Sequence, residues 1–324
     1  MTTYPWQERA WRQLHAATES RRLPHALLLT GPQGCGKDAF ACALAKTLLC
    51  AAPTDEGGAC GRCRDCELLA AGTHPNLIQV RPEEDSSAIK IDQIRGLIEQ
   101  IALTAVGKEA MRVVLIRPAD AMNRNAANSL LKTLEEPPLR TLLILVSHAP
   151  ATLPATIRSR CQRIDFGGER ALKVEWLRGQ LQSGIAAQCA LGLANGGPLL
   201  ALAMEQAGVF AERGRMMGEL QGLASGTVEP ITTAARWSGL DMTTALRVLI
   251  SLVQDLIRSK FAGPVEQLQH ADLHKVLQAT AERIDLSRLT RAHALLLEQW
   301  RLHVSGANVR PQDMLEDFTL LWTD

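Results

Sequence analysis

The stretch that decides the fold is His25-Ala-Leu-Leu-Leu-Thr30-Gly31-Pro-Gln-Gly-Cys-Gly36-Lys37-Asp38. Its apolar opening predicts a buried strand, and the residues after it match the pattern Gly-x4-Gly-Lys of a phosphate-binding loop. A helix is expected to follow from about Lys37 to Leu49. A strand, a glycine-rich turn and a helix in this order are typical of a parallel sheet covered by helices.

The rest of the first half continues this alternation. Apolar runs predict four more strands, at Asn76–Val80, Met111–Ile116, Leu142–Ser147 and Gln162–Phe166. Apolar residues at helical spacing predict a helix over Ile91–Thr104. Another helix is expected over Asn123–Glu135, ended by Pro137-Pro138, because proline cannot donate the helical hydrogen bond. The first half therefore reads as an α/β domain.

The second half shows only helical patterns. Gly167-Gly168 is a plausible hinge, and short helices broken at Asn195-Gly-Gly-Pro198 are expected up to about Glu205. Longer helical repeats follow, notably Met242–Phe261, Leu286–His303 and Pro311–Trp322. We predict three domains: an α/β domain over residues 1–167, a small helical domain over 168–206 and a larger helical domain over 207–324.

Composition limits the classes of function. In 324 residues the hydrophobic share is 46% and the aromatic share 4%, which favours a helix-rich protein with more than one core. Lys and Arg number 35 against 34 Asp and Glu, so no overall field attracts nucleic acid. The first residues carry charge and no run of about 18 apolar residues appears, so a cytoplasmic protein with no membrane partner is expected.

Four of the eight cysteines lie close together as C-x9-C-x2-C-x2-C: Cys50, Cys60, Cys63 and Cys66. Four soft ligands from glycine-rich turns suit Zn²⁺, and four thiolates leave no position for a catalytic water, so a structural site is predicted. The alternative is four unrelated buried cysteines. Charged neighbours make the segment too polar for a core: Asp55, Glu56, Arg62, Arg64 and Asp65. The other four, Cys35, Cys42, Cys161 and Cys189, are expected to be small buried hydrophobes.

The phosphate loop lacks the groups that hydrolysis requires. Asp38 stands where a Ser or Thr hydroxyl would bind Mg²⁺. Arg117-Pro118 follows the third strand, where two carboxylates would hold the metal and orient water, and Asp120 lies three residues too late. We therefore predict no ATP hydrolysis by this chain and interpret Gly31, Gly36, Lys37 and Asp38 as a degenerate loop, with weak nucleotide binding left open.

These residues resemble one family closely. The chain is similar to the delta-prime subunits of the bacterial replicative clamp loader, a family of AAA+ proteins, over its whole length and most specifically from Pro24 to Phe166. The resemblance rests on Pro24-His25-Ala26-Leu27-Leu28, the cysteine segment, Gly72-Thr73-His74-Pro75, Asn128-Ser-Leu-Leu-Lys-Thr-Leu-Glu-Glu-Pro-Pro138 and Ser159-Arg160-Cys161. Arg117–Met122 falls on the family stretch D-E-A-D-x-M, so only its two catalytic positions differ.

The resemblance implies a P-loop AAA+ domain with a zinc module over 50–66, a helical lid over 168–206 and a helical collar over 207–324. It implies that Leu200 replaces an arginine that senses the γ-phosphate in active relatives. It also implies that Arg160 acts as an arginine finger in the ATP site of a neighbouring subunit. The alternative for Arg160 is a surface ion pair within its own domain.

The resemblance further implies a non-catalytic stator in a DNA polymerase III holoenzyme, which is a DNA-directed DNA polymerase. Expected partners are the tau/gamma and delta subunits, with the sliding clamp and primed DNA reached through the complex. The rival enzyme interpretation is a competent ATPase like tau/gamma, against which Asp38, Arg117 and Leu200 argue. A zinc-dependent DNA-binding module is a third class, but the cysteine segment offers too little basic or aromatic surface.

Overall fold

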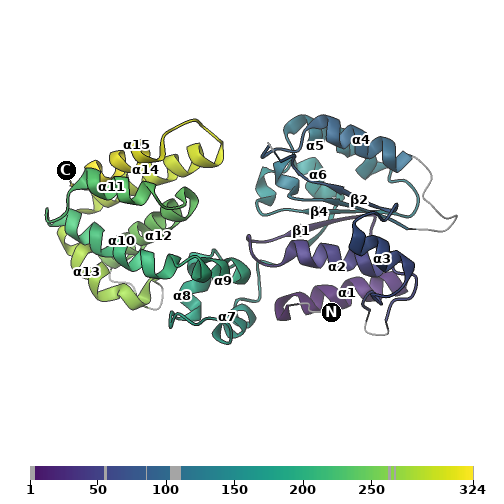
Figure 1. The fold of residues 1–324 in the computed structure, drawn as a ribbon, viewed down its shortest axis with the longest axis horizontal. Helices are drawn as coiled ribbons and strands as arrows, with labels where there is room; N and C mark the ends of the chain where they lie inside the picture. The colour runs from purple at the N-terminus through teal and green to yellow at the C-terminus, as the bar shows by residue number, and fades with distance from the viewer. Residues whose placement is uncertain are drawn as a thin grey trace. The chain divides into compact units, whose positions relative to one another are not determined.

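The computed structural model describes residues 4–54, 57–84, 86–102, 111–261, 264–265 and 268–323. The chain forms two compact units, Met1–Lys173 and Val174–Asp324, which are drawn in Figure 1. The expected division into residues 1–167, 168–206 and 207–324 stays a prediction. Asp55 and Glu56 of the cysteine segment and Leu103 and Thr104 at the end of an expected helix lie outside the described residues.

The first unit contains a parallel five-stranded sheet in the order β2-β3-β4-β1-β5. The strands are β1 (Ala26–Thr30), β2 (Leu77–Val80), β3 (Arg112–Ile116), β4 (Thr141–Val146) and β5 (Gln162–Asp165). Each of the five strands begins and ends within one residue of its predicted bounds. Every residue of β1, β3 and β4 is buried, which matches their continuously apolar sequences. The predicted α/β class of this half is confirmed.

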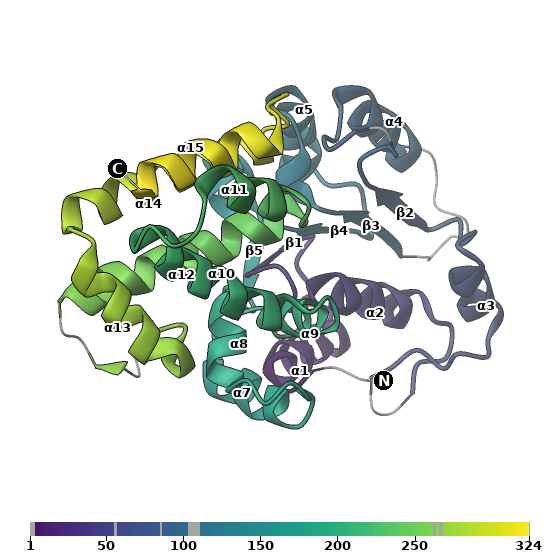
Figure 2. The same cartoon turned by 60° about the vertical axis from the view of Figure 1, so that its left-hand side comes forward.

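Helices cover both faces of this sheet. They are α1 (Glu8–Glu19), α2 (Lys37–Leu49), α3 (Arg64–Ala71), α4 (Ile91–Ala102), α5 (Arg124–Glu135) and α6 (Ala155–Arg160), joined by the 3-10 turns η1 (Pro5–Gln7), η2 (Ala119–Ala121) and η3 (Pro150–Thr152). Figure 2 shows α4 and α5 over one face of the sheet and α2 over the other. Apolar residues of α4, α5 and α6 form one core with alternate residues of β1, β3 and β4.

Local signals explain where two of these helices begin and end. Asn123 precedes α5, and its side-chain oxygen accepts the Ala126 N–H at 2.8 Å, which satisfies a free amide of the first turn. The helix ends at Glu135, ahead of Pro137. α2 begins at Lys37 directly after the loop, as the Gly-x4-Gly-Lys pattern predicts.

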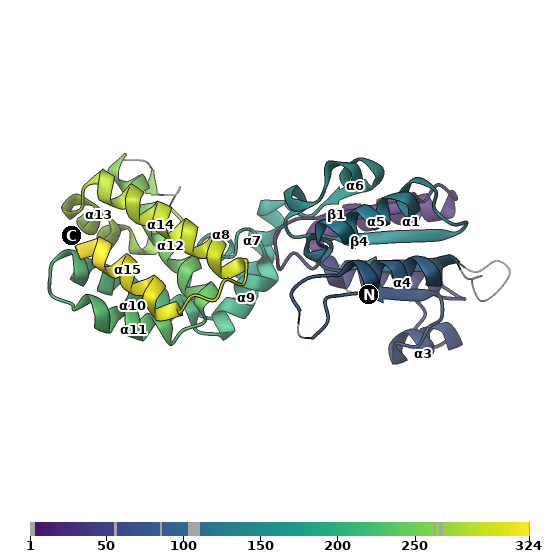
Figure 3. The same ribbon diagram turned by 90° about the horizontal axis from the view of Figure 1, so that it is seen from above.

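The elements of the second unit are all helices, with no strand among its described residues, as predicted. Its helices are α8 (Ala187–Leu193), α9 (Pro198–Gln206), α10 (Val209–Ala224), α11 (Pro230–Ser238), α12 (Met242–Lys260), α13 (His274–Arg283), α14 (Leu286–Val304) and α15 (Pro311–Thr323), with the 3-10 turn η5 (Ala271–Leu273); α7 (Arg170–Arg178) spans the boundary between the units. In Figure 3, α14 and α15 lie side by side. Among the described helices none is alone long and apolar enough to cross a membrane, and one pair, α8 with α9, meets that requirement only across a bend of 96°.

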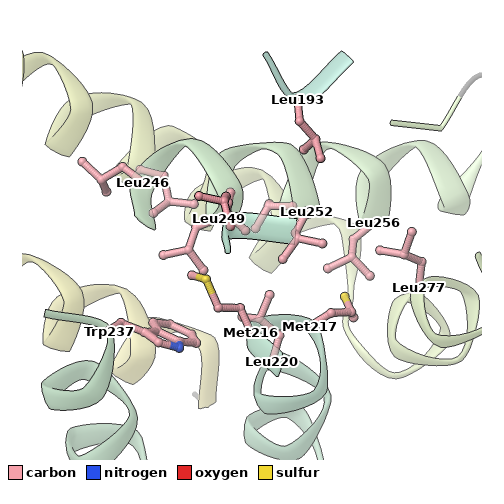
Figure 4. Packing of buried hydrophobic residues seen from close by; sticks show 14 of the residues in the cluster. Leu193, Met216, Met217, Leu220, Trp237, Leu246, Leu249, Leu252, Leu256 and Leu277 are labelled. Atoms are coloured by element: carbon pink, nitrogen blue, oxygen red, sulfur yellow. The ribbon is translucent and has the colours of Figure 1, made fainter. Parts of the chain in front are cut away.

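One hydrophobic core holds the second unit together. In Figure 4, Leu249, Leu252 and Leu256 of α12 face Met216 and Met217 of α10. Leu193, from the end of α8, belongs to the same core although it lies in the predicted lid segment. The predicted lid and collar segments therefore share buried apolar surface, which explains why both fall within one compact unit.

Candidate functional site

The four clustered cysteines converge on one point. Their sulfur atoms all lie within 4.8 Å of one another. The Sγ–Sγ distance is 3.8 Å for Cys50 and Cys63, 3.9 Å for Cys60 and Cys66, and 3.6 Å for Cys50 and Cys66. A tetrahedral zinc with bonds of about 2.3 Å to sulfur would separate its ligands by about 3.8 Å. A disulfide requires a sulfur–sulfur distance of about 2.05 Å, so the spacing fits a metal ion and not a bridge.

Backbone N–H groups donate hydrogen bonds to two of these sulfurs. The Cys60 N–H donates to Cys50 Sγ at 3.3 Å, and the Cys66 N–H donates to Cys63 Sγ at 3.4 Å. The Cys66 amide is the main cause that lowers the pKa of the Cys63 thiol to about 6, whereas burial raises the pKa of Cys66 to about 12. The four sulfurs make a ligand set that fits zinc, and the two N–H groups lie around them as outer hydrogen-bond donors.

Two contacts attach the cysteine segment to the first unit. Gly57 has a φ of +73°, and a Cβ there would lie 2.1 Å from the His15 ring of α1, so only glycine fits. On the other side, His74 Nε2 lies 3.5 Å from Asp65 Oδ1 of α3 while His74 Nδ1 accepts the Asn76 N–H at 3.1 Å. The Gly72-Thr73-His74-Pro75 motif thus connects α3 to the start of β2.

The phosphate loop has closed on itself. The Lys37 ammonium, in a side chain buried to 2% exposure, donates to the carbonyl oxygens of Gly31 and Pro32, both at 2.7 Å. In a phosphate-binding loop the backbone N–H groups surround the phosphate, whereas these two partners are carbonyl oxygens of the same loop. Asp38, the next residue, is exposed at the start of α2. The four predicted loop residues therefore lie together, and the lysine is hydrogen-bonded to carbonyls of its own loop.

Residues ahead of α1 cover this loop. Trp6 Nε1 donates to the Cys35 carbonyl at 3.0 Å, and Gln7 Nε2 donates to the carbonyls of Cys35 at 2.9 Å and Gly36 at 3.1 Å. Tyr4 stacks on Trp6 with ring centroids 4.9 Å apart. A Cβ at Gly36 would lie 2.7 Å from the Tyr4 ring. Sequence reasoning missed this cover, although aromatics are scarce in the chain and two lie here around a proline.

A second buried lysine lies at the same loop. Lys173 Nζ donates to the Phe166 carbonyl at 2.6 Å and the Gly167 carbonyl at 3.2 Å, and it lies 3.6 Å from Cys35 Sγ. Burial raises the pKa of the Cys35 thiol, so that sulfur is a neutral thiol at physiological pH, as expected of a buried cysteine. Nothing in the local sequence distinguished Lys173, because its partners lie up to 138 residues away.

The positions after β3 hold structural contacts in place of a metal site. Arg117 Nη1 lies 2.7 Å from Cys42 Sγ of α2, and Nη2 donates to Gln79 Oε1 of β2. Asp120 Oδ1 accepts the backbone N–H of His148 at 2.9 Å, which ties the turn after β3 to the end of β4. Leu200, half-buried, packs against the core of the second unit.

Arg160 is the last residue of α6 and is ion-paired within its own unit. Its Nη2 lies 2.5 Å from Glu135 Oε1, and its Nη1 donates to the Thr156 carbonyl at 3.0 Å. The arginine side chain remains 34% exposed and the glutamate 49%. The surface ion pair that the sequence left as an alternative is thus formed in the isolated chain. The role of Arg160 toward a neighbour stays a prediction.

Comparisons with known proteins agree over both units. A family model described as DNA polymerase III, delta subunit matches residues 6–169, and one described as its C-terminal part matches residues 208–324. The chain is 36% identical over 324 residues to DNA polymerase III subunit delta' of Pseudomonas aeruginosa, covering 98% of this chain and 97% of the relative. The same subunit of Yersinia pestis is 38% identical over 62% of this chain and 61% of its own length. DNA polymerase III subunit tau of Bacillus subtilis is 34% identical over 49% of this chain and 28% of the relative.

Proposed function

Because this chain belongs to the family of bacterial DNA polymerase III delta-prime subunits, we propose that it is a non-catalytic stator of the clamp loader that donates Arg160 to a neighbouring ATP site. As such it helps a ring of related subunits load the sliding clamp onto primed DNA. Its proposed partners are the tau/gamma and delta subunits of the same complex. The cytoplasm is the proposed location, since replication of DNA takes place there in bacteria.

The single observation that carries the non-catalytic role is the closed loop around Lys37. An active loop needs its lysine free to pair with the β- and γ-phosphates. Here the Lys37 ammonium is paired with the carbonyls of Gly31 and Pro32. The two carbonyls occupy two of the three N–H donors of the ammonium, so a phosphate has to compete with them for this lysine. This competition weakens nucleotide binding at this site.

Hydrolysis has a second obstacle after β3. The carboxylates that would bind Mg²⁺ and orient water are replaced by Arg117 and Pro118. The nearby carboxylate of Asp120 accepts the His148 amide. Arg117 is buried against α2 and β2, where its positive charge repels a metal ion. These contacts argue against the alternative, a competent ATPase resembling tau/gamma.

The ion pair of Arg160 is compatible with a role in trans. A partly exposed pair is worth about 1 kcal/mol or less, because water screens it and both side chains lose rotamer freedom. A transferring phosphoryl group carries more charge than Glu135 and accepts the planar guanidinium at two oxygens. A neighbour's phosphate can therefore replace Glu135 at low cost while the Thr156 carbonyl keeps holding the other guanidinium nitrogen.

We propose a structural zinc at Cys50, Cys60, Cys63 and Cys66. The ion crosslinks the segment between α2 and α3, which is too short and polar to have a core of its own. Four protein ligands complete the tetrahedron, so the site holds the fold and leaves no position for a reactive water.

A reconstituted loading assay tests the proposed function. The complex would contain the tau/gamma and delta partners, the sliding clamp and primed DNA, with clamp- and DNA-stimulated ATPase and loading as readouts. We expect Arg160→Ala to assemble normally and to lower stimulated turnover, because a finger acts mainly in the transition state. Arg160→Lys should rescue poorly, since lysine lacks the planar fork. The loss will be smaller than the roughly thousandfold typical of a finger, because other ATP sites in the complex keep working.

Two control variants separate the finger from the ion pair. Arg158→Ala removes an exposed arginine from the same helix and should leave turnover unchanged. Glu135→Ala breaks the same ion pair but keeps Arg160, so turnover should stay close to that of the wild type. If Glu135→Ala and Arg160→Ala lower turnover equally, Arg160 serves the ion pair alone and the finger assignment is wrong.

A further inference from the structure

A small cavity in the second unit has a cationic wall. It has a volume of about 240 Å³ and is formed by α12, α14, the turn after α8 and the segment before η5. One face of α12 contributes Arg247, Ile250 and Gln254, which recur at helical spacing. Trp300 lines the cavity from α14.

Arg247 lies over the Trp300 ring, with its guanidinium carbon 5.6 Å from the ring centroid. The side chain is half-buried, and burial lowers the pKa of the guanidinium while Asp241 opposes this effect. Asp241 is the N-cap residue of α12, where its Oδ2 accepts the Thr244 N–H. An arginine remains charged in proteins, so this cation is held away from bulk water with an aromatic ring as its neighbour.

Two other arginines of the second unit, the buried Arg213 and the partly buried Arg236, have carboxylate partners. Arg213 is paired with Asp272, and Arg236 is paired with Glu212 and Glu219. Among the described residues, no carboxylate forms an ion pair with Arg247. Arg247 has the charge of Asp241 nearby but no ion pair at contact distance, and a half-buried charge in this condition is costly, which a bound anion would relieve.

The cavity also offers neutral donors. Gln254 Nε2 lies 3.1 Å from His293 Nε2, and burial lowers the pKa of His293, so the neutral ring accepts one amide hydrogen. The amide has a second N–H that can donate to a ligand. Asn195 and Gln269 add two further amides to the lining.

Size and apolar lining define the rest of the ligand. A volume of about 240 Å³ exceeds the needs of a bare carboxylate or phosphate. Leu193, Ile250 and Leu297 supply aliphatic surface beside the cation. We propose that this cavity binds an oxyanion, a carboxylate or a phosphate, carried on a short aliphatic stem, with Arg247 and the Gln254 amide as its donors.

An NMR titration of the full-length ¹⁵N-labelled protein tests this proposal. The probes are butyrate, monobutyl phosphate and, as an uncharged control, 1-butanol, all at constant ionic strength. The indole N–H signal of Trp300, assigned from the spectrum of Trp300→Phe, is the readout. We expect at least one of the two anions to shift this signal saturably and 1-butanol to leave it unchanged. The anion with the lower Kd identifies the source of the negative charge.

Three variants make the titration decisive. Arg247→Met removes the charge and keeps the stem, and we expect the Kd to rise at least about tenfold, as for a lost charge-assisted hydrogen bond. Gln254→Glu places a carboxylate in the cavity and should weaken binding too, with thermal unfolding confirming that both variants are folded. Arg291→Met, an exposed arginine on α14, is the matched control and should bind normally. An equal shift with 1-butanol, no saturation with either anion, or an unchanged Kd in Arg247→Met would each overturn the proposal.

Discussion

Replacing Lys37 would distinguish a loop that only stabilises the fold from a loop that binds and hydrolyses ATP. In an ATPase, this lysine contacts phosphate, so its loss abolishes turnover and leaves the folded protein largely intact. Here the ammonium makes two charge-assisted hydrogen bonds of 2.7 Å to carbonyls inside the first unit. Lys37→Met keeps most of the side-chain volume and leaves both carbonyls without this partner. Each lost bond costs about 1–3 kcal/mol, so we expect the first unit to lose about 2–6 kcal/mol of stability.

The measurement must report on the first unit alone, because two compact units can unfold separately. Hydrogen exchange at the amides of α2 does so, since their slowest exchange follows the opening of this unit. Lys46→Met, an exposed lysine on the same helix, is the matched control and should change stability by less than about 0.5 kcal/mol. The same Lys37 variant should support clamp loading at nearly the normal rate in the reconstituted complex. Unchanged exchange in α2 together with loss of an ATPase activity of the isolated chain would refute the reasoning.

Two further predictions concern the metal site and a buried histidine. Metal analysis should find one zinc per chain. Cys63→Ser should lose the zinc and destabilise the segment between α2 and α3. A fully folded protein without metal, or a disulfide among the four cysteines, would contradict the predicted zinc site. In the second unit, Arg213 donates to His270 Nδ1 at 3.0 Å, and burial together with that cation lowers the pKa of His270 to about 3. Below about pH 6.5 the unfolded chain binds a proton at this histidine and the folded chain does not, so the stability of the second unit should fall as the pH drops from about 6.5 toward 3. The measurement is the unfolding of the second unit as a function of pH. A flat pH profile in the wild type, or an equally steep profile in His270→Gln, would contradict this prediction.

Much of the first unit follows from local sequence. Buried strands read as continuous apolar runs and helices as residues spaced three and four apart, so all five strands and α2 were predicted to within one residue. The spacing of the cysteines predicted that the four sulfurs would meet, because neighbouring residues in tight turns have few other arrangements. The replacements at Asp38, Arg117 and Pro118 were likewise visible as departures from a motif.

Only the tertiary structure decided which distant groups meet. Trp6 covers a loop 29 residues away, Lys173 reaches Cys35 across 138 residues, and Glu135 holds Arg160 across 25. The sequence alone carries no periodicity for such pairs, because their separation is set by how the helices pack on the sheet. The same holds for Arg247 and Trp300, which come from different helices of the second unit. The sequence determined the elements, the clustering of the four cysteines and the departures from the phosphate-loop motif. Packing determined which charged side chains are buried and which are paired, since burial and pairing depend on neighbours that only the folded chain supplies.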